Sequence, residues 1–90
     1  MMAKNIGFSL RNVFLAAKEA EEYFQAAIQR ASEIGAKGIQ GRASLDLGNL
    51  YKLKGRTDEA RKYITNAIQL FEECEADMFL KLAREMLASL

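Results

Sequence analysis

The chain has 90 residues, of which 50% are hydrophobic and 28% are charged, and it contains no proline. This composition is typical of one small soluble helical domain. Thirteen basic and twelve acidic residues leave a net charge of +1, which argues against nucleic acid or an anionic membrane as a partner. Cys74 is the single cysteine and histidine is absent, so we expect no disulfide, metal site or cofactor, and a reducing cytoplasmic location.

The first predicted element is one long helix from about Ser9 to Ile34. Apolar residues recur at three- and four-residue spacing from Ile6 to Ala31, which is the period of one helix face. The start of this stripe has no obvious partner within the chain, so we expect it to pair with a second copy and form a homodimer. The residues assigned to self-association are Ile6, Phe8, Leu10, Val13 and Phe14.

Three breaks separate three further predicted helices. The second helix covers about Gly38 to Lys54 and ends at Gly55, the residue type best able to adopt the left-handed conformation. The third covers Thr57 to about Glu73, with Thr57 as its N-cap. Asp77 is the predicted N-cap of the fourth helix, which is apolar on two sides and therefore needs two neighbours.

Small and large side chains alternate along the second and third helices as in a closely packed helix pair. Gly48 allows a close crossing, and Ala60 and Ala67 do the same from the other side. The segment 41–74 resembles the tetratricopeptide repeat family, whose unit is a pair of antiparallel helices. The residues that carry the resemblance are Leu47, Gly48, Tyr51, Ala60, Ile64 and Ala67, whereas Ser44 stands where the family usually has a bulky residue. The resemblance implies an all-α fold of stacked antiparallel hairpins, and an unrelated helical bundle is the alternative.

Two partial echoes extend this pattern. Glu19, Ala20, Tyr23, Ala27, Ile28 and Gln29 recur 40 residues later, so the first helix resembles the second helix of a preceding repeat. Phe79, Leu82, Ala83 and Met86 echo Ser44, Leu47, Gly48 and Tyr51 at a spacing of 35, as expected of a capping helix. We expect one domain, with a long helix within 1–35, a complete repeat at 38–74 and a cap at 77–90. Because Leu15-Ala16-Ala17 stands where a turn is due, the first hairpin is either truncated or fused.

The resemblance implies an interaction scaffold rather than an enzyme, with a protein or peptide bound on the concave face. The positions that it places there are Arg42, Leu45, Asp46, Asn49, Lys52, Leu53, Lys81 and Arg84. Asn49 matches the asparagine of a carboxylate clamp, but Leu45 replaces the expected base, so partly apolar recognition is favoured. The style of the sequence resembles terminal repeats of large bacterial signalling proteins, of which this chain would be a regulatory segment.

Four alternatives stay open at this point. The chain could be a purely structural oligomerisation module that binds only itself. A basic neighbourhood around the second break could bind phosphate, although acidic residues lie within it. Glu72, Glu73, Glu75 and Asp77 could hold a metal ion weakly or form an ordinary solvated acidic run. A small enzyme is the weakest reading, since the sequence has no histidine and no recognisable nucleophile with a base.

Overall fold

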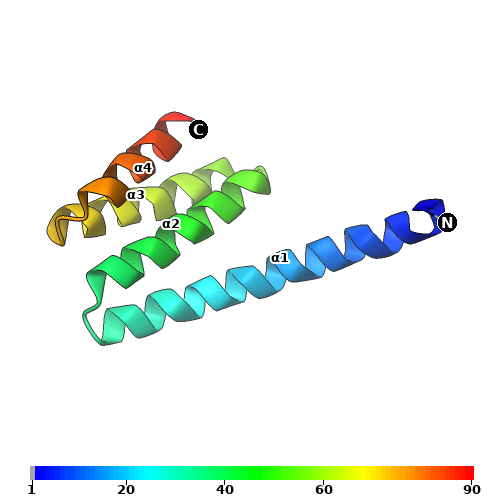
Figure 1. Ribbon diagram of the computed structural model, residues 1–90, viewed down its shortest axis with the longest axis horizontal. Coiled ribbons are helices and arrows are strands. Elements are labelled where there is room, and N and C mark those ends of the chain that lie inside the picture. The colour runs from blue at the N-terminus through cyan, green and yellow to red at the C-terminus, as the bar shows by residue number, and fades with distance from the viewer. Residues whose placement is uncertain (1) are drawn as a thin grey trace.

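The computed structural model describes residues 2–90, with side chains described at position 13 and from position 15 onward. The described chain forms α1 (Met2–Glu33), α2 (Lys37–Leu53), α3 (Thr57–Glu73) and α4 (Asp77–Ala88). Consecutive helices run antiparallel, and α2 lies against α1, α3 and α4 (Figure 1). The predicted all-α fold of stacked antiparallel hairpins is confirmed. Within residues 2–90, no helix is both long enough and apolar enough to cross a membrane.

The three turns between the helices share one geometry and recur every 20 residues. Gly35, Gly55 and Glu75 have φ values of 70°, 77° and 57°, in the left-handed region. After each of them, the next backbone N–H donates to the carbonyl five residues earlier, as Arg56 does to Tyr51 over 2.9 Å. This is the Schellman pattern, which satisfies carbonyls at a helix end. The helices that follow therefore begin at Lys37, Thr57 and Asp77, and the full repeat of the structure is 40 residues.

Several predicted helix boundaries differ from those of the structure. The long helix begins at Met2 rather than Ser9, so nothing ends it at Gly7. Thr57 and Asp77 are the first helical residues and not N-caps, because Arg56 and Ala76 occupy the cap positions. Neither cap makes a side-chain hydrogen bond. The Schellman turn places each helix start two residues after the left-handed residue, which moves both predicted caps into the first turn.

The core lies mainly between α2 and α3. Leu47, Ile64 and Phe71 are its largest fully buried side chains. A Cβ atom added to Gly48 would lie 2.6 Å from Cγ1 of Ile64 and 3.3 Å from the carbonyl oxygen of Ala60. Since real Cβ contacts are longer than this, Gly48 sets the distance between the two helices, as the sequence pattern predicted.

The helix α1 is much longer than the helices against which it packs. It has 32 residues, whereas α2 and α3 have 17 each. Figure 1 shows its N-terminal half extending away from the other three helices, and the molecule reaches 51 Å along its longest axis. At about 1.5 Å per residue, residues 2–17 account for about 22 Å of this helix. Any partner of this half must therefore come from outside the α2–α4 body.

Candidate interaction surfaces

One face of α2 carries four of the eight residues predicted to bind a partner. Arg42, Asp46, Asn49 and Leu53 follow each other at four- and three-residue spacing, so they form one stripe. Arg42, Asn49 and Leu53 are exposed, and Asp46 is half-buried. We call these four residues the α2 stripe.

The stripe lies beside α4, and two basic side chains lean across to that helix. The guanidinium carbon of Arg42 is 4.8 Å from the ring centroid of Phe79. Lys52 Nζ donates to Ser89 Oγ over 2.6 Å at the other end of α4. Burial raises the pKa of the Asp46 carboxyl, and the positive charge of Arg42 opposes that shift. Since Arg42 and Lys52 are engaged with α4, Asn49 and Leu53 are the parts of this surface most free to meet a partner.

The prediction that Leu45 lies on an accessible concave face is wrong for this structure. Its side chain is only 3% exposed and belongs to the hydrophobic core. The physical reason is that α2 packs against three other helices, so Leu45 is covered although it lies one helical turn before Asn49 of the α2 stripe. Apolar recognition on this face is left to Leu53, whose side chain is 76% exposed.

Lys81 and Arg84 are exposed, but they do not continue the α2 stripe. The 40-residue repeat aligns them with Gly41 and Ser44, which are buried in α2. Gly41 faces the ring of Phe71 in α3, so the matching side of α4 is turned away from α2. In agreement, Arg84 Nη2 approaches α3, 4.0 Å from Glu72 Oε1. The predicted spacing of 35 residues for this echo is therefore wrong, and the α4 counterparts of Arg42 and Asp46 are Leu82 and Met86.

The basic residues around the second turn do not form a free cationic patch. Lys54 Nζ lies 3.1 Å from Glu21 Oε2, and Arg56 pairs with Glu59. Arg61 Nη1 lies 3.6 Å from Asp58 Oδ1. Because these charges are neutralised by neighbouring carboxylates, the geometry gives no support to a phosphate site. Among the described side chains, no three carboxylate or thiol groups converge as they would on a metal ion.

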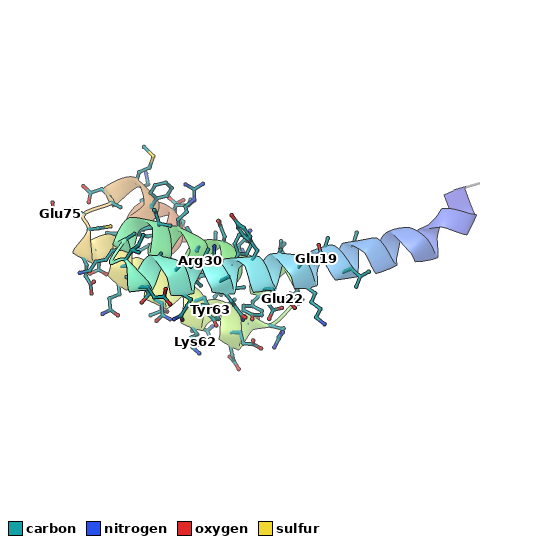
Figure 2. All side chains as sticks on the ribbon, turned by 90° about the horizontal axis from the view of Figure 1, so that it is seen from below. Glu19, Glu22, Arg30, Lys62, Tyr63 and Glu75 are labelled. Atoms are coloured by element: carbon teal, nitrogen blue, oxygen red, sulfur yellow. The ribbon has the colours of Figure 1, made fainter. Side chains whose placement is uncertain are left out.

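A hydrogen-bonded group fastens the end of α2 to the middle of α1. Tyr51 O–H donates to Glu21 Oε1 over 2.6 Å, and Lys54 Nζ donates to Glu21 Oε2 over 3.1 Å. The hydrogen bond from Tyr51, followed by that from Lys54, lowers the pKa of Glu21. Burial, followed by the bond to Glu21, raises the pKa of Tyr51 to about 12. Glu21 thus marks the place beyond which α1 leaves the body; Figure 2 shows Glu19 and Glu22 at this point.

An apolar groove runs between α1 and α2 on the side of the α2 stripe. It consists of two adjoining hollows of about 480 and 390 Å³, which share Tyr23, Ala27 and Ile39. Phe24 and Phe79 line the first hollow, and Ala31 lines the second. We call it the α1–α2 groove. Its walls are mostly apolar, with Arg42 and Asp46 at the edge.

Comparison with known proteins decides the family. The sequence profile described as tetratricopeptide repeat matches residues 3–73, which run from the start of α1 to the end of α3. The chain belongs to the tetratricopeptide repeat family. No curated protein and no solved structure gives a significant match. Tetratricopeptide repeats are scaffolds that generally bind protein partners on the surfaces formed by stacking.

The match includes the N-terminal half of α1, where the self-association residues were predicted. Of these, Val13 is described, and its side chain is 66% exposed. Ile6, Phe8, Leu10 and Phe14 lie outside the described side chains. The family match begins at residue 3, so it includes this part of α1.

Sequence reasoning missed the groove residues Tyr23, Phe24, Ile39 and Phe79 as members of one surface. The sequence does contain a signal for them, because Tyr23 recurs as Tyr63 after 40 residues. Extending that echo to all four helices aligns Ile39 with Phe79 and places both on the same side of the tetratricopeptide stack. The 35-residue alignment of α4 hid this correspondence.

Proposed function

We propose that this chain is a protein-interaction module with two working surfaces. The α2 stripe binds a partner peptide, and the N-terminal half of α1 joins two copies of the chain in a homodimer. We further propose that the module is the regulatory part of a larger cytoplasmic protein of the bacterial signalling class. The segments 1–35, 38–74 and 77–90 serve in it as self-association helix, complete repeat and cap.

The observation that carries the peptide-binding proposal is the exposure of Leu53 next to Asn49 on the α2 stripe. An apolar side chain that is 76% exposed beside a free amide offers one apolar contact and one hydrogen-bonding contact to an extended peptide. Lys52 lies beside this pair and keeps its positive charge while it donates to Ser89, which favours a peptide with acidic residues. The partner expected from this chemistry is a partly apolar, acidic peptide.

The test selects displayed peptides on the immobilised chain and measures their affinity for three variants. Leu53→Glu and Asn49→Ala should each weaken the selected peptides by about tenfold, which corresponds to the loss of about 1.4 kcal/mol. Thr65→Glu, at an exposed position of α3, is the matched control and should bind as the wild type does. Peptides that bind Leu53→Glu and Asn49→Ala with unchanged affinity would refute the α2 stripe as the site. A chain that selects no peptide but stays dimeric would favour a purely structural oligomerisation module.

A further inference from the structure

We infer that the α1–α2 groove is the seat of residues 3–13 from a second copy of the chain, so that two copies exchange their N-terminal helical segments. This inference rests on the homotypic part of the proposed function and specifies its geometry. In this arrangement the groove is filled by a helix of the partner chain. Leu15 keeps α1 helical, so that the N-terminal segment cannot fold back onto its own chain.

The α1 wall of the groove has the same pattern of small and large residues as the face of α3 that packs against α2. Ala60, Ile64 and Ala67 of α3 are fully buried, and Gly48 of α2 touches the first two of them. Their counterparts 40 residues earlier are Ala20, Phe24 and Ala27, all of which are only half-buried. Phe24 and Ala27 line the groove. This wall is therefore the surface of a second helix whose first helix is missing.

The α2 wall corresponds in the same way to a surface of α4 that lies beside α2. Ile39 aligns with Phe79 of α4, and Phe79 lies under Arg42 of α2. Ile39 itself is 62% exposed and faces the groove. A helix that continued the stack would contact Ile39 as α2 contacts Phe79. Both walls thus fit one occupant, which is the first helix of the first repeat.

The chain carries a segment with the sequence of that helix. The family match begins at residue 3, and the 40-residue repeat places the first helix of the first repeat before residue 14. Ile6, Leu10 and Val13 have the spacing of one apolar helix face. The segment does not reach the groove of its own chain, because α1 runs straight through residues 14–16.

Leu15 explains why the chain does not turn back. The 20-residue recurrence of left-handed residues at 35, 55 and 75 places the preceding one at position 15. Leucine in that conformation costs about 1–2 kcal/mol, whereas glycine adopts it freely. A continuous helix is therefore favoured at Leu15. As a result, residues 3–13 extend away from residues 19–33 and do not pack against them. A second copy placed antiparallel can then exchange this helix reciprocally.

The first test restores the turn. Leu15→Gly should let the segment fold into its own groove, and should raise the dimer dissociation constant by at least about a hundredfold. Leu15→Ala, which also removes the side chain but favours the helix, should stay dimeric. Circular dichroism checks that both variants keep their helices, and sedimentation equilibrium gives the mass. A Leu15→Gly chain that dimerises as tightly as Leu15→Ala overturns the inference.

The second test separates the groove from the peptide site. Ile39→Glu and Val13→Glu change two exposed side chains and should each yield monomers, whereas Leu53→Glu should stay dimeric. Mixing the Ile39→Glu and Val13→Glu chains should restore a heterodimer, because one groove and one segment in the pair remain intact. Dimers that resist Ile39→Glu and Val13→Glu but dissociate with Leu82→Glu would show head-to-tail docking of α4, and would overturn the exchange while leaving self-association in place. A wild-type monomer would refute both.

Discussion

The close approach of α2 and α3 at Gly48 leads to a prediction whose sign depends on the structure. Alanine at an exposed helical glycine stabilises a protein by about 1 kcal/mol, because alanine has the higher helix propensity. At Gly48 the new methyl group would lie 2.6 Å from Ile64 Cγ1, and Ile64 is fully buried. Overpacking of this kind costs about 1–3 kcal/mol. We therefore expect Gly48→Ala to destabilise the chain by about 1 kcal/mol after the propensity gain is subtracted.

The assay is thermal and urea unfolding of Gly48→Ala beside Gly38→Ala. Gly38 also lies in α2, but an added Cβ there has no atom within 4 Å. Gly38→Ala should raise the melting temperature and Gly48→Ala should lower it, each by about 4–8 °C for about 1 kcal/mol. If Gly48→Ala stabilises the chain as much as Gly38→Ala does, the close packing that defines the repeat is absent and the reasoning fails.

Two further predictions concern the α1–α2 fastening and the third turn. Because the pKa of Tyr51 is raised from 10.0 to about 12, the folded state keeps the proton longer, so stability present below pH 10 is lost as pH rises toward 12. The loss is on the order of 3 kcal/mol, and urea midpoints of Tyr51→Phe should lack this extra decline. Glu75→Gly should stabilise the chain by about 0.5–1 kcal/mol, since glutamate at φ 57° is strained there. Glu72→Gly, within α3, should instead destabilise it in the same unfolding assay, and equal effects of the two changes would argue against the turn geometry.

The α2–α3 hairpin was predictable because its signals are local. Gly55 marks the turn, and the alternation of Gly48 with Ile64 fixes how the two helices cross. The burial of Leu45 was not predictable from this pattern, because it depends on how many helices surround α2. The burial of such a side chain depends on tertiary packing and not on the local sequence pattern.

The position of α4 was harder to predict because its turn lacks the usual sequence signal. Glu75 adopts the left-handed conformation that Gly35 and Gly55 adopt in the other two turns. The 20-residue recurrence of the turns is therefore a property of the backbone that the residue types do not reveal. The misaligned echo then placed Lys81 and Arg84 on the wrong side of the helix. At Leu15 the 20-residue recurrence would place a further turn, but leucine favours a helix and α1 is continuous there.

We infer that the first repeat lacks the turn between its two helices, and that the α1–α2 groove is therefore covered only when two copies of the chain associate. Sedimentation equilibrium of the wild-type chain and Leu15→Gly, over micromolar concentrations, tests it most directly. We expect the wild-type chain to sediment at twice the 10.1 kDa mass of one chain, and Leu15→Gly to sediment as a single chain. A wild-type chain that sediments at 10.1 kDa throughout would contradict the account.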